Sequence, residues 1–400
     1  MKPLIFVKVE RKILFEAATA ASRTTLTPAQ CQKNILPMIF SCIVFDVKDL
    51  VIDLIGANNF EHTKSSVTIL HRIGNGGRFA VMACDLVPIL RRLEGEEVTI
   101  EVYEYQAVFR HFYGSFTLPL VTDSMDLLIE RIGLLEERFS YHTIELEAPF
   151  FKSMLNRLNK YIEDDFYRPA MNGICIRRKA GKIDYVASNC HRLVCITRKD
   201  EECTLSSSLL IPADVVNVLR RIVPNTGFIR IDYSEWKEGV KENKDKPVCH
   251  ISIDNGTDLW FTPTEGKYPD YVKVIPSSFA CTCRIQRTLL LRSLDRMSFL
   301  CPDRGIIRAT LADDKISLYS KDKDFETEQA ETLPCEYKSQ PMTLGLSIRN
   351  AMPVLSSIHS KYVVIQSTGS LNNGFVIVPD KQPENETVTA LFMPCSIAED

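Results

Sequence analysis

A short amphipathic segment occurs three times along the chain at nearly equal spacing. The copies are residues 87–93 (VPILRRL), 216–222 (VNVLRRI) and 352–358 (MPVLSSI). They begin 129 and then 136 residues apart, and each interval is close to one third of the 400 residues. Recurrence at a fixed interval indicates duplicated structural units. The sequence therefore predicts three copies of one domain of about 130 residues, a comfortable size for a single core.

The three copies also have similar surroundings. A segment with the alternating or apolar pattern of a β-strand follows each copy, at residues 97–102, 227–232 and 362–366. A further helix is expected to open each unit, at residues 11–22, 150–161 and 287–299. Strands are expected after the last two of these helices, at residues 172–177 and 304–311. The middle helix carries one apolar stripe at helical spacing, formed by Phe151, Met154, Leu155 and Leu158.

These patterns predict an α+β protein built from three repeated two-layer domains, each with two helices on one side of an antiparallel sheet. The domains are expected at residues 1–142, 143–276 and 277–400. Residues 235–247 are dense in Lys and Glu, which favours a long solvated hairpin loop. Residues 379–387 are expected to form a similar loop before a final strand.

The composition excludes several classes of protein. Hydrophobic residues make up 45% and charged residues 25%, which are globular values and exclude a disordered chain, a collagen and a long coiled coil. The net charge of −3 gives no overall attraction to nucleic acid, so DNA binding requires a segregated basic surface. The first residues lack the apolar length of an export signal or membrane span, so we expect a cytoplasmic protein.

The cysteine pattern indicates neither disulfides nor a metal site. The 13 cysteines are scattered singly, and the closest pair is Cys281 and Cys283. Scattered thiols without a framework are typical of a reducing compartment. Zinc sites need close pairs of ligands, which the cysteines and the seven histidines do not supply. No metal and no cofactor is therefore predicted.

Basic residues recur on the expected helices although the whole chain is net acidic. This is the segregation that a DNA-binding surface needs, and the contacts would be with phosphates, because no recognition helix, zinc finger or stacking aromatic set accompanies the charges. The alternative is that Arg and Lys are good helix formers found on any solvated helix face. The candidate DNA-contacting residues are Lys33, Arg91, Arg92, Lys152, Arg157, Lys160, Arg168, Arg220, Arg221, Arg292, Arg296 and Arg349.

No catalytic set is predicted. The glycine-rich residues 74–78 lack the pattern of a phosphate-binding loop and favour a tight turn. Cys190 and His191 are adjacent, and neighbouring residues of a strand point to opposite faces, so they are not expected to share a proton. The acidic pairs at residues 164–165 and 313–314 have turn-like surroundings. An enzyme is therefore not expected.

Three segments resemble one known family. They are residues 186–193 (VASNCHRL), residues 266–276 (GKYPDYVKVIP) and residues 391–394 (LFMP). Bacterial DNA sliding clamps, the β subunit of the DNA polymerase III holoenzyme, have T-D-G-H-R-L and G-R-F-P-D-Y-x-x-V-L-P at the first two places. The resemblance covers the whole chain. It implies a DNA clamp fold, a head-to-tail homodimer that closes a ring around duplex DNA, and a processivity factor that is not an enzyme.

The resemblance further implies a groove that binds linear peptides of DNA polymerase, the clamp loader and other clamp-binding-motif proteins. Its hydrophobic pocket would be rimmed by Arg192 and Lys273. The matching positions are Met171, Ser188, Cys190, His191, Arg192, Leu193, Pro269, Lys273, Val274, Leu371, Asn373, Leu391, Phe392, Met393, Pro394, Cys395 and Ser396.

The chain departs from the family at several groove positions. Cys190 replaces a Gly, Cys395 a Met and Ser396 an Arg, and residues 398–400 extend past the usual end. We expect weaker affinity for the usual peptide of the family. Cys190 adds a side chain where the family has none, which is expected to narrow the pocket or alter a turn.

The dimer contact is expected at Phe299 and Leu300, with the first-domain edge strand at residues 107–112 as their partner. The alternative is that Phe299 ends an ordinary core stripe. Two other functions compete with a processivity clamp. One is an accessory clamp-like scaffold that binds polymerase peptides without encircling DNA, and the other is an enzyme at an interdomain cleft.

Overall fold

The computed structural model describes residues 2–136, 142–199, 205, 208–234, 247–301, 305–322 and 326–396. It divides into two compact units. Unit 1 contains Met1–Lys152 and Asn217–Pro263, and unit 2 contains Ser153–Val216 and Thr264–Asp400. The chain passes between the units three times, within α5 (Ala148–Leu158), within α6 (Ala213–Ile222) and between Pro263 and Thr264. Most of the expected loop at residues 235–247 and the extension at residues 398–400 lie outside the described residues.

Unit 1 is organised around a 12-stranded antiparallel sheet. Its main path runs β8-β7-β6-β1-β4-β16-β15-β14-β9, and β2, β3 and β5 branch from β4. The pairing of β4 with β16 joins the first repeat to strands of the second. The strands are β1 (Ile5–Glu10), β2 (Cys42–Val47), β3 (Val51–Ala57), β4 (Glu61–Ile73), β5 (Gly77–Met82), β6 (Glu97–Val102), β7 (Gln106–His111), β8 (Gly114–Pro119), β9 (His142–Glu147), β14 (Phe228–Tyr233), β15 (Cys249–Ile253) and β16 (Thr257–Phe261).

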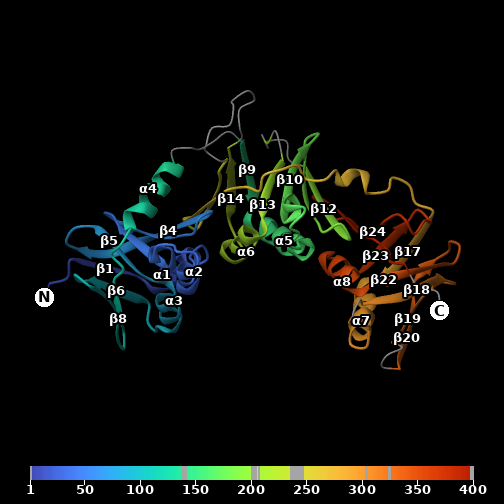
Figure 1. Ribbon diagram of the computed structural model, residues 1–400, viewed down its shortest axis with the longest axis horizontal. Helices are drawn as coiled ribbons and strands as arrows, with labels where there is room; N and C mark the ends of the chain where they lie inside the picture. Colours follow the sequence, from blue (N-terminus) through green and yellow to red (C-terminus); the bar gives the residue numbers. More distant parts are fainter. Residues whose placement is uncertain are drawn as a thin grey trace. The chain divides into compact units, whose positions relative to one another are not determined.

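Two helices cover one face of the sheet in the first repeat, as the sequence predicts. Helix α1 (Arg11–Ala21) and helix α3 (Ala83–Arg92) pack together against it (Figure 1). Leu14 and Leu90 are fully buried between the helices and the sheet, together with Phe45 and Phe79, whose rings stack 4.5 Å apart. Because their apolar faces pack in this core, α1 and α3 hold the polar residues at their C-terminal ends in defined positions.

A second core covers the other face of β2, β3 and β5, which the two-layer prediction did not include. It is formed by α2 (Pro28–Lys33), the 3-10 turn η1 (Met38–Ser41) and α4 (Met125–Glu136). Along β2, Ile43 and Phe45 belong to the first core, whereas Cys42 and Val44 belong to the second. Because neighbouring strand residues point to opposite faces, this part of unit 1 has three layers. Every residue of β2 is therefore buried.

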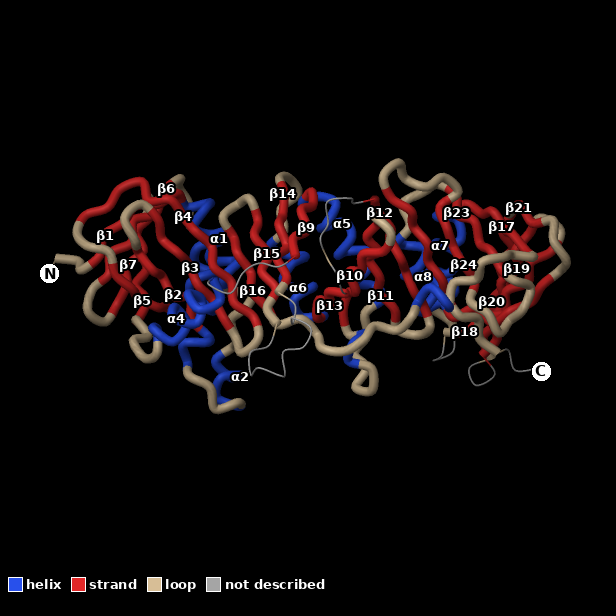
Figure 2. Tube along the Cα trace, turned by 90° about the horizontal axis from the view of Figure 1, so that it is seen from above, coloured by secondary structure: helices blue, strands red, loops and turns tan. Residues whose placement is uncertain are grey.

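Unit 2 contains a nine-stranded sheet, in the order β13-β10-β11-β12-β25-β24-β23-β17-β21, and a four-stranded sheet, β20-β19-β18-β22. Figure 2 shows β10, β11 and β13 side by side. The strands are β10 (Gly173–Lys179), β11 (Lys182–Ser188), β12 (Arg192–Lys199), β13 (Ser208–Pro212), β17 (Cys281–Gln286), β18 (Ile306–Ala312), β19 (Lys315–Asp322), β20 (Thr327–Pro334), β21 (Glu336–Tyr337), β22 (Met342–Ser347), β23 (Tyr362–Ser367), β24 (Phe375–Pro379) and β25 (Glu386–Phe392).

The pairing of β12 with β25 joins the second repeat to the third inside one sheet. Helices α7 (Arg287–Ser298) and α8 (Ile348–Ser357) pack together in the third repeat. Three short 3-10 turns complete unit 2, namely η2 (Asn159–Tyr161), η3 (Pro169–Met171) and η4 (Tyr271–Lys273).

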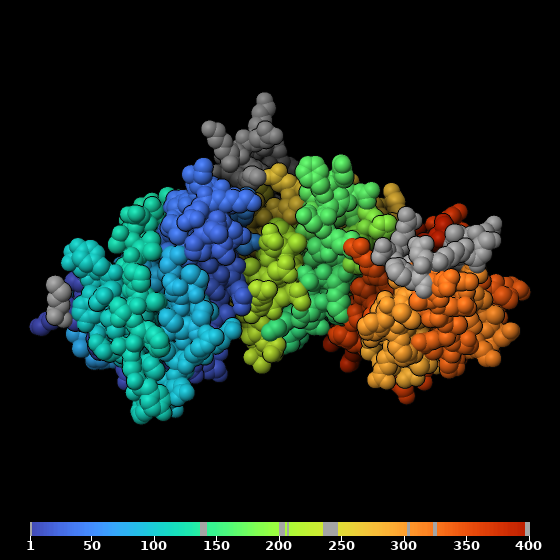
Figure 3. All heavy atoms as spheres, turned by 60° about the horizontal axis from the view of Figure 1, so that its bottom comes forward, coloured from blue at the N-terminus to red at the C-terminus, as the bar shows by residue number. Residues whose placement is uncertain are grey.

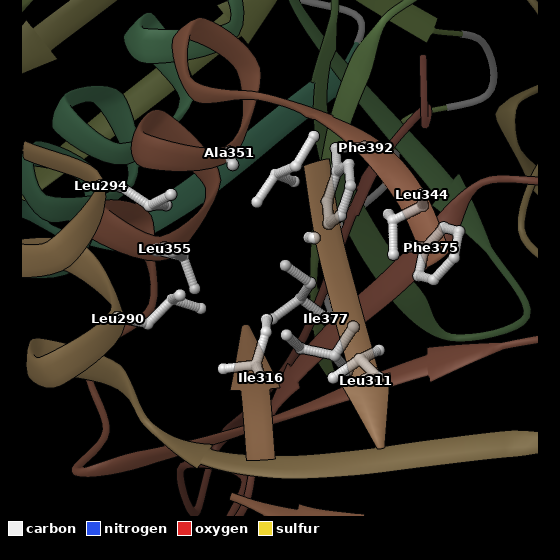
Figure 4. Close-up of a pocket in the computed structure, with 13 residues that line it drawn as sticks. Leu290, Leu294, Leu311, Ile316, Leu344, Ala351, Leu355, Phe375, Ile377 and Phe392 are labelled. Atoms are coloured by element: carbon white, nitrogen blue, oxygen red, sulfur yellow. The ribbon is translucent and has the colours of Figure 1, made fainter. Parts of the chain in front are cut away.

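The core of the third repeat encloses a small cavity of about 20 Å³ (Figure 4). Leu290 and Leu355 reach it from the two helices, and Ile316, Phe375 and Phe392 reach it from the sheets. Its lining is entirely apolar, so a water molecule there would lack hydrogen-bond partners. The cavity belongs to the packed interior of the repeat.

The predicted elements agree closely with the observed ones. The stripe of Phe151, Met154, Leu155 and Leu158 is buried, and α5 ends at Leu158 before the turn η2. The strand expected at residues 304–311 runs from Ile306 to Ala312, and Arg304 lies outside the described residues. Residues 74–76 connect β4 to β5. Across the described part of the chain, no helix is both long and apolar enough to cross a membrane.

Candidate functional site

Three arginines from separate elements come together in unit 1. Arg91 lies in the last turn of α3, and Arg221 lies in the last turn of α6. The pKa of Arg23, which follows α1, is lowered by burial and then by the positive charges of Arg221 and Arg91. Among the described residues, the buried Nε of Arg23 has no hydrogen-bond acceptor. The three guanidinium groups therefore concentrate positive charge in this part of unit 1.

Sequence analysis found two members of this cluster and missed the third. Arg91 and Arg221 are both exposed on the repeated helices, although the position that matches Arg91 is Arg220. Arg23 lies outside the repeated segment and follows an alanine-rich helix, so no pattern in the sequence marked it. A search for Arg or Lys just after each predicted helix would have found it.

The other predicted cations of unit 1 are less clearly grouped. Arg92 is exposed, and its Nη1 donates to Pro88 O at 3.0 Å. Arg220 and Lys152 are half-buried. Lys33 is exposed at the end of α2, a helix whose Cys31 is buried in the second core. The charge of Lys33 is not among those that lower the pKa of Arg23.

Arg157 does not lie on an exposed helix face, contrary to the prediction. It is buried, its Nε donates to Ser357 O at 2.9 Å, and its Nη1 donates to Glu386 Oε1 at 2.8 Å. The Nζ of Lys160 donates to Ser356 O at 3.1 Å. Both cations of α5 and η2 thus bind the last turn of α8. Inside unit 2, the guanidinium of Arg157 donates to a carbonyl at the C-terminus of α8 and to the carboxylate of Glu386, so it is unavailable to a phosphate.

The remaining cations of unit 2 differ in how far they are neutralised. Arg296 makes two hydrogen bonds to the carboxylate of Glu331, at 2.9 and 2.6 Å. Arg349 is exposed, with Nη2 3.5 Å from Glu163 Oε1, and Arg292 is exposed on α7. A paired arginine attracts phosphate less strongly than a free one, so Arg296 is the weaker candidate of the two on α7.

An exposed aromatic pair accompanies the predicted cation Arg168, although the sequence suggested no stacking aromatic set. Phe166 and Tyr167 are 91% and 89% exposed, and their rings meet edge to face 5.8 Å apart. Exposed rings beside a guanidinium can stack on nucleic-acid bases. Arg168 is itself exposed, and its Nη1 contacts Cys190 Sγ. The structure thus brings Arg168 to the predicted groove rather than to the other basic residues.

Several predicted groove residues assemble into one apolar cluster in unit 2, which we call the groove cluster. Met171, Leu193 and Leu391 are buried in it, and Met393 packs against it. Leu193 and Leu391 face each other directly across the β12–β25 pairing. The remaining buried members are Cys175, Val186, Cys195, Leu210, Tyr268, Tyr271 and Val376.

A tight turn between β11 and β12 forms one side of the groove cluster. The Oδ1 of Asn189 accepts from the N–H groups of His191 and Arg192, at 3.1 and 2.9 Å. Cys190 has a φ of 71°, in the left-handed region where glycine is favoured. The family has Gly at this position, and Cys190 keeps the turn at the cost of backbone strain. Cys190 and His191 therefore lie in a turn, not in a strand as the sequence suggested, and both are exposed.

Arg192 does not form an exposed rim, contrary to expectation. It is buried, and its guanidinium donates to Arg349 O at 3.0 Å and to Glu163 Oε1 at 3.0 Å. Burial lowers the pKa of Arg192, and the charge of Glu163 opposes that shift. The side chain links three segments beneath the turn, so its role is to hold the groove together.

Other predicted groove residues remain on the surface. Pro269, Lys273 and Val274 are exposed around η4, and Lys273 lies 3.5 Å from Asp270. Leu371 is exposed, and Asn373 donates to Thr368 Oγ1 at 3.0 Å. Of the two cations predicted at the groove rim, Arg192 is buried and Lys273 is accessible to solvent.

The predicted groove residues at the end of β25 face two different places. Leu391 faces the groove cluster, whereas Phe392 faces the cavity of the third repeat and stacks on Phe375 at 5.6 Å (Figure 4). The assignment of Phe392 to the groove is wrong, because side chains alternate along a strand. Beyond β25, Met393 N donates to His191 O at 2.8 Å.

The last described residues follow the same edge of unit 2. Cys395 N donates to Gly345 O at 2.8 Å. Pro394 and Cys395 are half-buried, and Ser396 is exposed. Ser188, at the other side of the turn, is buried, and its Oγ donates to Arg192 O at 3.0 Å.

The predicted dimer residues are exposed. Phe299 is 81% and Leu300 52% exposed, just past α7, whose buried stripe consists of Leu290, Leu294 and Met297. The alternative that Phe299 ends this stripe is wrong. The strand proposed as their partner is also misplaced, because β7 pairs on both sides and β8 ends the sheet. Exposed Phe112 and Phe116 flank this edge, which forms part of the surface of unit 1 (Figure 3).

Comparison with known proteins agrees with this architecture. Residues 272–396 match the family model of the DNA polymerase III beta subunit, C-terminal domain. A DNA polymerase III beta subunit from Thermotoga maritima superposes with a TM-score of 0.83 at 17% identity, covering 98% of this chain and 100% of its own. The chain has the fold of the bacterial DNA sliding clamps. A clamp from Pseudomonas aeruginosa bound to griselimycin also superposes with a TM-score of 0.83, at 16% identity and with the same coverage.

Proteins with similar sequences are also named beta sliding clamps. The beta sliding clamp of Staphylococcus aureus is 20% identical over 312 residues, which are 77% of each chain. That of Staphylococcus epidermidis is 19% identical over the same length. Within the described residues, no group of three His, Cys, Asp or Glu side chains could hold a metal ion.

Proposed function

We propose that this chain is a DNA polymerase processivity factor. The observation that carries the proposal is the cluster of Arg23, Arg91 and Arg221, which concentrates positive charge near the ends of three helices in a sliding-clamp fold. Such a cluster attracts phosphates without reading base sequence. A net-acidic chain with a local basic surface suits a protein that moves along duplex DNA without adhering elsewhere.

The proposed assembly is a head-to-tail homodimer that closes a ring around duplex DNA. Each chain would contribute three domains, at residues 1–142, 143–276 and 277–400. The exposed edge at β8, with Phe112 and Phe116, and the exposed Phe299 and Leu300 are the surfaces that we assign to the contact. Exposed large apolar side chains at a strand edge favour pairing with another chain.

The proposed partners are DNA polymerase, the clamp loader and other proteins that carry clamp-binding peptides. The groove cluster of Met171, Leu193 and Leu391, with the exposed Pro269, Lys273 and Val274 near it in sequence, supports this, because apolar anchors of linear peptides bind at apolar surfaces. Cys190, Cys395 and Ser396 differ from the family, so we retain the expectation of weaker affinity for its usual peptide. A non-catalytic role on DNA would place the protein at the nucleoid in the cytoplasm.

The proposal is tested by loading the protein with a clamp loader onto nicked circular DNA and then linearising the circle. A topologically closed ring stays on the circle at high salt and leaves once free ends exist. The competing function, an accessory scaffold that binds polymerase peptides without encircling DNA, gives neither behaviour. A simple basic binder dissociates with salt from both forms of DNA.

A variant with Arg23, Arg91 and Arg221 changed to Glu separates the two surfaces. We expect weaker loading or retention with peptide binding intact, because the groove cluster lies in unit 2 and the arginines in unit 1. Equal loss of both activities would indicate general unfolding and contradict the proposed division of roles.

A further inference from the structure

Four cations lie together on one face of the nine-stranded sheet in unit 2, and we call them the basic strip. They are Arg177 and Lys179 on β10, Lys182 on β11 and Lys199 on β12. Lys182 pairs directly with Lys179 on one side and with Lys199 on the other. Residues directly opposite on adjacent strands share a face of the sheet, so the three lysines form one row across three strands.

A two-residue turn holds the first two lysines of the row opposite each other. Ala180 and Gly181 connect β10 to β11, and both have a positive φ, of 49° and 69°. Positive φ at both central residues is typical of the tight hairpin turn that fixes the register of its two strands. The turn therefore keeps Lys179 beside Lys182.

The basic strip has no ionic partner within the described part of the chain. Its three lysines are exposed, Arg177 is half-buried, and none of the four forms an ion pair there. The carboxylate opposite Arg177 belongs to Asp184. That carboxylate accepts from Tyr271 Oη and from Thr197 Oγ1, both at 2.6 Å. Asp184 is thus engaged by two hydroxyl groups, and the row of lysines has no carboxylate directly opposite it in the strand pairing.

The row of lysines lowers the stability of the sheet that carries it. Like charges directly opposite on neighbouring strands are destabilising, and Lys182 makes two such contacts. Natural proteins tolerate local conflicts of this kind mainly at functional sites. An anionic partner would turn both repulsive contacts into attractive ones.

The basic strip faces away from helix α8. Arg192, on the same strand as Lys199, reaches α8, where its guanidinium donates to Arg349 O. Lys199 comes seven residues after Arg192, and an odd interval along a strand places the two side chains on opposite faces. The sheet therefore separates the strip from the exposed cation Arg349.

The spacing of the basic strip fits an acidic peptide in an extended conformation. Adjacent strands are about 4.8 Å apart, and alternate residues of one strand, such as Arg177 and Lys179, are about 6.7 Å apart. Alternate side chains of an extended peptide repeat at the same distance of about 6.7 Å. Acidic residues at every second position would therefore meet successive cations. The strip itself includes no aromatic ring on which a nucleic-acid base could stack.

We propose that the basic strip binds an acidic linear segment of a partner protein, with Glu or Asp at alternate positions. Lys182 is the central residue of the contact, because it adjoins both other lysines of the row. This inference goes beyond the proposed function. It requires neither peptide binding by the groove cluster nor a ring around DNA.

The test measures binding of the full-length protein to a fluorescein-labelled peptide of alternating Glu and Thr. A peptide with Gln in place of Glu is the control for charge. Fluorescence anisotropy should show tighter binding of the Glu peptide, by roughly tenfold or more at about 50 mM NaCl, and a clear loss of affinity at about 300 mM. Lys182→Glu should weaken binding of the Glu peptide by roughly tenfold, because it removes one attraction and adds one repulsion. Lys338→Glu, an equal change of charge at an exposed lysine outside the strip, should leave the affinity within about twofold.

Thermal unfolding gives a second readout that does not depend on the choice of peptide. Lys182→Glu should raise the midpoint of unfolding, because it places a negative charge between Lys179 and Lys199. Lys338→Glu should leave the midpoint nearly unchanged. A lower midpoint for Lys182→Glu would contradict the like-charge row on which the inference rests.

Three further results overturn the inference. The first is equal binding of the Glu and Gln peptides, or no binding of either. The second is a labelled DNA duplex that loses as much affinity in Lys182→Glu as the Glu peptide does, which would make the strip a nucleic-acid surface. The third concerns the acidic residues 200–202, which follow Lys199 and lie outside the described residues. If the Glu peptide binds only after these three are changed to their amides, the chain's own acidic residues occupy the strip and no partner is needed.

Discussion

Arg157 Nη1 lies 2.8 Å from Glu386 Oε1, and both side chains are largely removed from solvent, at 6% and 16% exposure. This ion pair connects α5 to β25, so a cation that the sequence assigned to DNA instead joins the second repeat to the third. Ser357 O accepts from the same guanidinium, so Arg157 also satisfies the end of α8.

We expect Arg157→Ala to lower the free energy of unfolding by about 3–5 kcal/mol, because removing one partner leaves Glu386 without its buried counter-ion. Urea denaturation followed by circular dichroism measures the change. Arg292→Ala is the matched control, since this exposed residue should change stability by less than about 0.5 kcal/mol. Similar values for the two variants would contradict the structural role of Arg157.

The cluster of Arg23, Arg91 and Arg221 should determine how DNA binding depends on salt. Replacing all three with Ala should reduce the slope of log K against log salt by roughly one unit for each phosphate that the variant no longer neutralises. Titration of labelled duplex DNA at several salt concentrations gives the slope. Arg296→Ala, whose guanidinium is already paired with Glu331, should reduce it less. An unchanged slope in the triple variant would remove the cluster from the DNA surface.

Cys190 should be replaceable by Gly with a gain in stability. Its φ of 71° is strained for any side chain, and Gly relieves the strain, for a gain of about 1 kcal/mol. The same substitution at Cys84, inside α3, should instead lower stability by about 1 kcal/mol, because Gly is a poor helix former. Thermal unfolding of both variants measures the opposite signs, and a loss of stability in Cys190→Gly would contradict the assigned strain.

The buried His62 should make the protein less stable in mild acid. Burial, and to a smaller extent the positive charge of Arg131, lowers the pKa of His62 to about 3. The ordinary pKa of a histidine is about 6.5. Between these values the unfolded chain binds the extra proton, so the free energy of unfolding falls with decreasing pH by up to about 1.4 kcal/mol per unit from this group. His62→Phe should flatten the profile measured by urea titration between pH 4 and 7. An identical profile in the variant would show that other groups cause it.

Phe299→Asp should weaken the homodimer without affecting the fold, because the side chain is 81% exposed and makes no core contact of α7. Light scattering after size-exclusion chromatography measures the mass at several protein concentrations. Leu127→Asp on α4 is the control, since Leu127 is an apolar residue that is 48% exposed and is not one of the residues assigned to the contact. Loss of the dimer in both variants, or in neither, would argue against Phe299 as an interface residue.

Periodic patterns predicted the buried faces of the helices well, because burial imposes periodicity on the sequence. The stripe through Phe151 and Leu158 had the spacing of a buried helix face, and both residues are buried. The second core around Trp260 was not predicted. Its helix α4 has no counterpart in the repeated pattern, and Leu127 and Leu134 on its exposed side obscure the apolar face.

Individual charges were predicted less well. The sequence does not distinguish an arginine on a solvated helix face from one such as Arg157 that reaches a distant carboxylate, because Glu386 lies 229 residues further along the chain. Arg192 was misassigned for the same reason, since its partners Glu163 and Arg349 come from other elements. Hydrogen-bond partners that are remote in sequence leave no local signal.

The two sheet junctions affect how this chain unfolds. Because β4 pairs with β16 and β12 pairs with β25, each of these two sheets contains strands from neighbouring repeats. The cooperative blocks seen by hydrogen exchange should therefore follow the two units, not the three sequence repeats. A fragment cut at residue 277 would carry β25 with a bare backbone edge where β12 belongs, which is a template for aggregation.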